Sequence, residues 1–93
     1  MIIGVLSLEL YLPENQSLKE KRMILRSLKD TLRRQFNISV AEADEHDLWQ
    51  RCRLDVAGIG QDRRYVNGQL SGVVEWVRRQ RSVELTDYEL TWC

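Results

Sequence analysis

The sequence predicts an α+β domain with the element order β-α-β-β-α-β. Alternating apolar residues indicate strands near both ends of the chain and in its middle. Two segments between these strands repeat apolar residues at helical spacing, and each starts at a capping residue. A chain of 93 residues has room for one such domain, residues 1–93, and not for two.

The first predicted element is a long, half-buried strand over residues 2–12, ended by Pro13. Apolar side chains alternate along it and share one parity, so one face is expected to be buried. These residues are Ile2, Leu6, Leu8, Leu10 and Leu12.

A helix is predicted over residues 17–36, because Ser17 and Glu20 form a capping box at its start. The Ser17 hydroxyl is placed to accept a hydrogen bond from the Glu20 amide. Apolar residues then recur at helical spacing and predict the buried stripe. They are Leu18, Leu25, Leu28, Leu32 and Phe36.

Two strands are predicted over residues 38–43 and 51–60, joined by a polar loop at 44–50. In the second of them, one parity is apolar and predicts the buried face. Gly58 and Gly60 end this strand. The apolar parity consists of Cys52, Leu54 and Val56.

Asp62 is the expected N-cap of a second helix over residues 63–81, and a last strand is predicted over residues 83–92. In that strand Val83 and Leu85 have the opposite parity to its later apolar residues, which a β-bulge would reconcile. The helix stripe consists of Val66, Leu70, Val73, Val74 and Val77.

This element order is that of the ferredoxin-like fold. Right-handed crossovers place both helices on one face of a four-stranded antiparallel sheet, with the first and third strands at its centre. The other face of the sheet is then open to solvent or to a partner.

Composition narrows the class of protein. The longest apolar run is far shorter than the roughly 20 residues that span a bilayer. The start of the chain has no basic segment and reaches Glu9 too early for a signal peptide, so a cytoplasmic location is expected. Cys52 and Cys93 fit neither a disulfide framework nor zinc-site spacing.

Charge is unevenly distributed although the net charge is zero. Residues 17–36 carry seven basic and two acidic side chains, a net charge of +5. Residues 62–81 carry five basic and two acidic side chains, a net charge of +3. The helical layer is therefore expected to be strongly positive, and the strands and loops equally negative.

Five cations of the first predicted helix lie within an arc of about 80° on one flank. Such a row can follow a line of phosphates in RNA. The alternative is an ordinary solvated helix face, since Lys and Arg favour helices. The five candidate nucleic-acid-binding residues, here called the basic flank, are Lys19, Arg22, Arg26, Lys29 and Arg33.

The open sheet face does not have the residues that stack RNA bases on this fold. Tyr11 is the one aromatic residue of its two central strands, and no RNP1-like motif is present. Its mixed charges suit cross-strand ion pairs or a dimer contact. The residues expected on this face are Val5, Ser7, Glu9 and Tyr11, with Arg51, Arg53, Asp55 and Ala57.

Three aromatic residues are candidates for contact with a protein partner: Trp49, Tyr65 and Trp76. Tyr65 and Trp76 share one flank of the second predicted helix with Gly72. The alternative is that this flank packs against the first helix, with Gly72 permitting close approach.

His46, the single histidine, lies between acidic residues, with Glu42 and Asp44 on the same side of an extended chain. A second histidine and an EF-hand glycine are both missing, so we expect an acidic, solvated loop and no metal or cofactor. We likewise expect no nucleophilic pair between Cys52 and His46.

Three stretches together are characteristic, and on them the chain resembles the YlxP-like bacterial family of unknown function. They are Ser17–Arg22, Asn37–Glu42 and Asp47–Arg51. The resemblance extends over essentially the whole length. It implies a ferredoxin-like fold and a gene neighbourhood with translation initiation factor two and ribosome-binding factor A, but no established catalytic residues. The closing Thr91–Cys93 has no counterpart in the resemblance.

The first functional hypothesis is a non-catalytic RNA- or ribosome-associated accessory protein that uses the basic helical layer. The alternative is a small interaction module that forms a homodimer through its open sheet face. Neither hypothesis involves a membrane, a cofactor or a small-molecule substrate.

Overall fold

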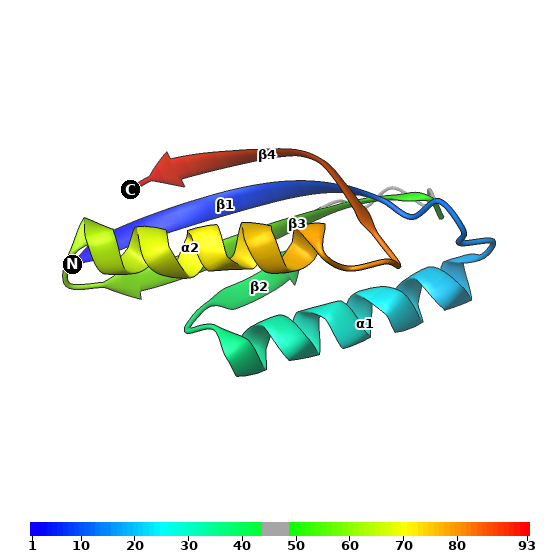
Figure 1. Cartoon of the computed structure of the whole chain (residues 1–93), viewed down its shortest axis with the longest axis horizontal. Helices are drawn as coiled ribbons and strands as arrows, with labels where there is room; N and C mark the ends of the chain where they lie inside the picture. The colour runs from blue at the N-terminus through cyan, green and yellow to red at the C-terminus, as the bar shows by residue number, and fades with distance from the viewer. Residues whose placement is uncertain (44–48) are drawn as a thin grey trace.

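The computed structural model describes residues 1–43 and 49–93. It has the predicted ferredoxin-like α+β architecture, with both helices on one face of the sheet (Figure 1). Along the chain the elements are β1 (Ile2–Tyr11), α1 (Leu18–Gln35), β2 (Ser39–Glu42), β3 (Arg51–Gly60), α2 (Arg63–Arg78) and β4 (Glu84–Trp92).

The sheet has the strand order β2-β3-β1-β4, and each neighbouring pair is antiparallel. The predicted central position of β1 and β3 is confirmed. These two strands pair without interruption from Ile2 opposite Gly60 to Tyr11 opposite Arg51. This register places the predicted outward residues of the two strands opposite one another, so their shared open face is also as predicted.

The parity conflict in β4 is resolved by the predicted bulge. Leu85 lies opposite Leu10 and Asp87 lies opposite Glu9, so Thr86 is the extra residue. The Thr86 hydroxyl donates a hydrogen bond of 3.1 Å to the Glu9 carbonyl oxygen. The bulge lets Leu85 and Leu90 face the helices although their sequence parities differ.

Both predicted helix N-caps are present. The Ser17 hydroxyl accepts a 3.1 Å hydrogen bond from the Glu20 amide, and the Asp62 carboxylate accepts a 2.8 Å bond from the Tyr65 amide. α2 ends at Arg78, three residues before the predicted end at 81. There the Gln80 side chain donates to the Trp76 carbonyl oxygen at 2.9 Å, which satisfies a terminal carbonyl group.

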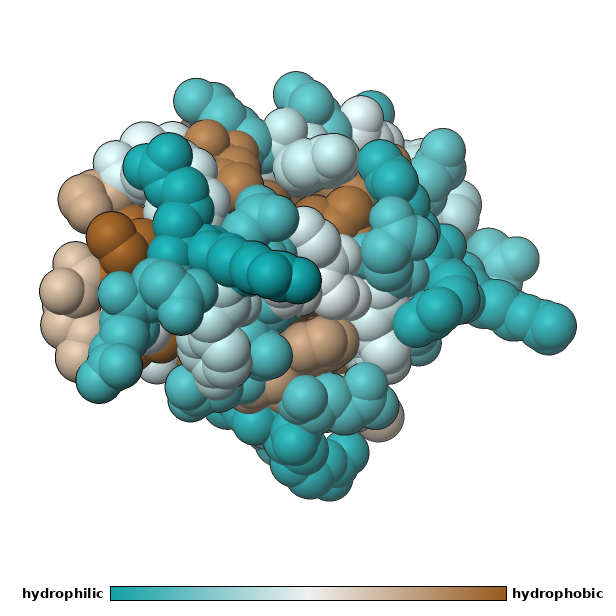
Figure 2. All heavy atoms as spheres, turned by 60° about the vertical axis from the view of Figure 1, so that its left-hand side comes forward, coloured by the Kyte–Doolittle hydropathy of each residue, from teal (hydrophilic) through white to brown (hydrophobic). Residues whose placement is uncertain are grey.

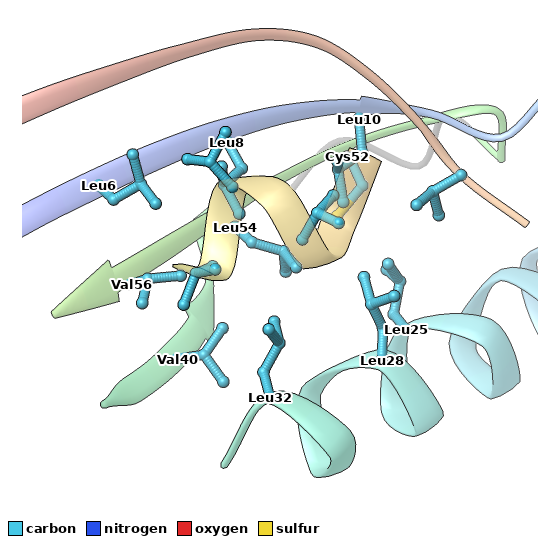
Figure 3. Close-up of a cluster of buried hydrophobic side chains, with 14 of the residues drawn as sticks. Leu6, Leu8, Leu10, Leu25, Leu28, Leu32, Val40, Cys52, Leu54 and Val56 are labelled. Atoms are coloured by element: carbon cyan, nitrogen blue, oxygen red, sulfur yellow. The ribbon is translucent and has the colours of Figure 1, made fainter. Parts of the chain in front are cut away.

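The core lies between the sheet and the two helices (Figure 3). Leu25, Leu28 and Leu32 point from α1 toward the sheet, as the helical stripe predicts. Leu18 and Phe36 are only half-buried at the ends of this stripe. The residues of β1 and β3 that form the floor of the core include Leu6, Leu8, Leu10, Cys52, Leu54 and Val56.

α2 approaches the sheet closely over a cross-strand pair of glycines, Gly4 and Gly58. A Cβ atom on Gly4 would lie 2.8 Å from Leu70 Cδ1. Gly58 is less crowded, since a Cβ atom there would be 3.4 Å from the nearest atom of Val66. The missing side chains therefore set how deeply α2 packs onto β1 and β3.

No helix in the part of the chain that the structure describes is long and apolar enough to cross a membrane.

Candidate nucleic-acid interface

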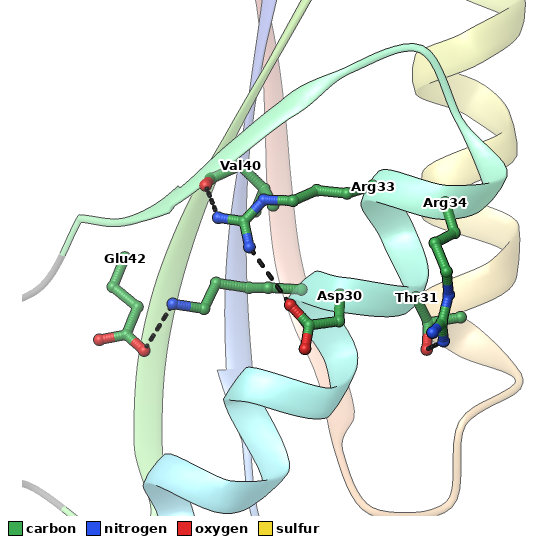
Figure 4. A network of polar contacts seen from close by, with 7 residues as sticks. Asp30, Thr31, Arg33, Arg34, Val40 and Glu42 are labelled. Atoms are coloured by element: carbon green, nitrogen blue, oxygen red, sulfur yellow. Dashed lines mark hydrogen bonds and ion pairs between the residues drawn. The ribbon is translucent and has the colours of Figure 1, made fainter.

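The basic flank of α1 turns toward the edge strand β2, because the leucine stripe beside it faces the sheet. Two of its five residues reach β2 and are held there (Figure 4). Lys29 Nζ lies 3.3 Å from Glu42 Oε1. One Arg33 nitrogen donates to the Val40 carbonyl oxygen at 3.0 Å, and another lies 3.5 Å from Asp30 Oδ1.

These contacts change what Lys29 and Arg33 offer to a ligand. The Lys29 side chain is only 21% exposed and its charge is balanced by Glu42. The Arg33 side chain is 48% exposed, so part of its guanidinium group is still open to solvent. Lys29 therefore mainly joins α1 to β2. Arg33 joins the same two elements and also contributes to the positive surface.

The other three residues of the flank, Lys19, Arg22 and Arg26, are exposed. Within residues 1–43 and 49–93, their side chains form no hydrogen bond or ion pair. At 1.5 Å per residue they extend over about 10 Å of the helix. The N-terminal half of α1 thus carries a row of three cations whose charge no described protein group balances.

Arg34 adds a cation on the other flank of α1, where the sequence analysis placed no site. Its guanidinium group donates a 3.2 Å hydrogen bond to the Thr31 hydroxyl, on the side away from Arg33 (Figure 4). That side faces α2. This contact could have been predicted from the sequence, because side chains three residues apart on a helix are neighbours.

Two arginines of α2 lie over aromatic rings of β4. Arg63 lies over the ring of Trp92, 4.6 Å from its centroid, and Arg78 lies 5.5 Å from that of Tyr88. Arg78 also forms a 3.3 Å ion pair with Glu75. Part of the positive charge of α2 therefore packs this helix against β4.

The three candidate protein-contact residues do not form one surface. Trp49 is 51% exposed, and its carbonyl oxygen accepts a hydrogen bond from the buried Asn15 side chain. Tyr65 is 44% exposed, and its hydroxyl accepts a 3.2 Å bond from the Asn37 side chain near the end of α1. Trp76 is half-buried and packs partly against the core.

Trp76 lines a groove between α1 and α2 with a volume of about 370 Å³. We call this the interhelical groove. The residues of its walls that matter below are Met23, Ile24, Ser27 and Thr31 from α1, Trp76 from α2, and Gln80 just after α2. The sequence placed Trp76 beside Gly72 on one flank of α2, but which residues of α1 lie opposite depends on how the helices dock.

The open sheet face is predominantly acidic. Arg53 lies opposite Glu9, forms a 3.2 Å ion pair with Asp55, and donates to the Ser7 hydroxyl at 3.3 Å. Arg51 lies over the ring of Tyr11. Against these two arginines, the register places five carboxylates on the same face. They belong to Glu9, Asp55, Glu84, Asp87 and Glu89.

The surface is hydrophilic on the side shown in Figure 2, where apolar residues emerge only in separate areas. That view presents the end of the molecule at which β1 starts. A partner that docks there meets polar and charged side chains over most of its contact area.

The described residues contain no group of three or more side chains that could hold a metal ion. Asp44 and His46 lie outside the described residues. Cys52 is buried in the core, and Cys93 is exposed at the end of the chain. These residues therefore do not change the description of the basic flank as a set of cationic side chains.

Comparison with known proteins assigns the chain to a family. A model described as "Protein of unknown function (DUF503)" matches residues 3–90. The chain belongs to the DUF503 family. The resemblance to YlxP-like proteins is confirmed as well. The uncharacterized protein YlxP of Bacillus subtilis (strain 168) is 28% identical over 91 residues, which cover 98% of this chain and 99% of that relative.

Neither the description of the DUF503 family nor the name of this relative mentions an enzymatic activity. Membership therefore carries no catalytic residues to this chain.

Proposed function

We propose that this protein is a non-catalytic RNA-binding accessory protein that holds the phosphate backbone of RNA, free or in a ribosomal particle, on the basic flank of α1. The observation that carries the proposal is the row of Lys19, Arg22 and Arg26, which are exposed and unbalanced by any described carboxylate. The gene neighbourhood implied by the family resemblance is weaker, associational support.

The distribution of partners along the flank favours an anionic ligand at the N-terminal half of α1. Glu42 balances Lys29, and Asp30 lies beside Arg33, so the C-terminal half has part of its charge compensated. A phosphate backbone binds mainly through such charges and releases counterions when it does. We therefore assign the principal contacts to Lys19, Arg22 and Arg26, which have no partner among the described residues, and a supporting contact to Arg33.

The charge of the open sheet face also favours RNA binding through α1. Its five carboxylates outnumber its two arginines, so it repels a polyanion. The acidic excess also disfavours docking of two copies through this face, because like charges would be brought together. The self-association hypothesis thus has less support from the charges than RNA binding through α1.

The test is RNA binding across a salt series, with a fluorescently labelled unstructured RNA. A variant with Lys19, Arg22 and Arg26 changed to Gln should lose about 0.7–0.9 units of log–log salt slope for each phosphate contact removed. A control with Arg51, Arg63 and Arg64 changed to Gln loses the same charge from β3 and α2 and should keep the wild-type slope.

Circular dichroism checks that both variants are folded. The proposal fails if the wild-type protein does not bind RNA at low salt, or if the α1 variant keeps its slope. Purified ribosomal subunits serve as a second probe. If the wild-type protein binds subunits and the α1 variant loses both this binding and its salt slope with free RNA, the same row of cations also holds RNA in the ribosomal particle.

A further inference from the structure

Met23 lies on the solvent-exposed side of α1, between the basic flank, which turns toward β2, and the interhelical groove, which faces α2. Met23 is 64% exposed and lines the groove. Lys19 lies four residues before it and Arg26 three residues after it, so both are its neighbours on the helix surface. Lys19 and Arg26 are therefore the residues of the basic flank nearest the mouth of the groove, and the exposed Glu20, three residues before Met23, borders the same mouth.

The wall formed by Trp76 is suited to a flat ring. Trp76 packs against the core and also lines the groove. Of the rings in residues 1–43 and 49–93, those of Tyr11, Tyr88 and Trp92 each have an arginine over them, and Trp76 has none. Indole presents a large surface for stacking of another aromatic ring.

The remaining walls offer hydrogen bonds and no negative charge. Ser27 brings a hydroxyl group to the groove, and Gln80 brings an amide whose nitrogen already donates to the Trp76 carbonyl oxygen and whose oxygen can accept. The Thr31 hydroxyl accepts from Arg34 and can itself donate. None of its lining residues is acidic, and Arg34 is bonded to Thr31 at its edge. An apolar wall with polar edges, and a rim on which Lys19, Arg26 and Arg34 outnumber Glu20, suits a planar, polar, anionic ligand better than an aliphatic side chain.

We infer that the interhelical groove receives one unpaired base of a single-stranded RNA, stacked on Trp76, while the adjoining phosphates lie on the basic flank. This inference rests on the proposed function and narrows its ligand to single-stranded RNA. Duplex RNA can use the phosphate contacts but cannot insert a base, because its bases are paired and stacked.

The test compares single-stranded RNA with a duplex of the same sequence. Trp76→Leu should weaken single-strand binding about 5- to 150-fold, which corresponds to the loss of one stacked base. Its salt slope should remain that of the wild type because no phosphate contact is lost, and duplex binding should be unchanged. Trp76→Phe should retain part of the affinity. Trp49→Leu, a change at an exposed tryptophan outside the groove, is the matched control.

Ser27→Phe provides a second test that does not alter the core or the charge, since Ser27 is exposed. It fills the groove and should weaken single-strand binding as Trp76→Leu does. The inference is overturned if Ser27→Phe binds single strands like the wild type, or if Trp76→Leu weakens single-strand and duplex binding equally.

These outcomes are distinct from failure of the proposed function. If the groove variants bind normally while the Lys19, Arg22 and Arg26 variant loses salt slope, the proposed phosphate contacts are supported and the base-binding groove is ruled out. If the wild-type protein binds neither RNA at low salt, both fall.

Discussion

The ring of Phe36 lies directly against Gly72: a Cβ atom on Gly72 would be 2.7 Å from Phe36 Cε1. Phe36 is the C-cap residue of α1, and Gly72 lies inside α2. The contact joins the two helices beyond the Thr31 and Trp76 end of the interhelical groove. This part of α2 therefore packs against the end of α1, and Gly72 permits the close approach, which was the alternative to a protein-contact surface on this flank.

Substitution of Gly72 should show how tightly this contact is packed. Alanine in place of glycine inside a helix normally stabilises it by about 1 kcal/mol. Gly68→Ala should show this gain, because nothing lies within 4 Å of a Cβ atom there. Gly72→Ala must displace Phe36 and should be less stable than Gly68→Ala by about 1–3 kcal/mol in urea unfolding. Equal stability of the two variants would mean that the ring moves aside without cost.

Leu28 tests the buried stripe of α1. Its exposed fraction is 4%, and Leu28→Ala should lower the free energy of unfolding by about 2–5 kcal/mol through lost burial and a residual cavity. Met23→Ala on the same helix is the control. Met23 is 64% exposed, so its change should be within about 0.5 kcal/mol. An unchanged denaturant midpoint for Leu28→Ala would contradict the observed orientation of α1.

Deletion of Thr86 tests the bulge in β4. Without the extra residue, Leu85 and the preceding Val83 would be turned away from the core or the strand would slip by one position. We expect a loss of at least about 2 kcal/mol in the free energy of unfolding. Thr86→Ala keeps the residue count and should cost no more than about 1 kcal/mol. A deletion variant as stable as Thr86→Ala would show that the register does not depend on the bulge.

Glu42 tests the balance of charge on the basic flank. Glu42→Gln removes the carboxylate that lies 3.3 Å from Lys29, so this lysine becomes available to a phosphate. RNA affinity at low salt should rise, with a salt slope steeper by up to about 0.7–0.9 units. Stability should change by no more than about 1 kcal/mol because the pair is partly exposed.

Glu84→Gln is the matched control for this measurement, since it removes one negative charge from the open sheet face. If both variants bind more tightly by the same factor, net charge alone accounts for the effect and Lys29 makes no specific contact.

Most of the fold follows from short-range patterns. The capping residues Ser17 and Asp62 and the leucine stripe of α1 are readable because helical neighbours are only three or four residues apart. The outward face of β1 and β3 is readable because side chains alternate along a strand. The bulge was required by conflicting parities, but its position at Thr86 was settled only by pairing with β1.

The candidate site was predictable only in part. Helical periodicity groups five cations on one flank of α1, but it does not tell which of them meet a carboxylate. Lys29 is paired with Glu42 and Arg33 with the Val40 carbonyl oxygen because β2 lies beside this flank in the folded sheet.

By itself, the sequence determined the order of elements, the buried and exposed faces, and the positive character of the helical layer, since these depend on neighbours along one element. Only the tertiary structure decided which cations stand without partners and which wall faces Trp76. Those properties depend on the docking of α1 against β2 and α2, through contacts such as Phe36 with Gly72. Such contacts join residues far apart in the chain, and no local spacing encodes them.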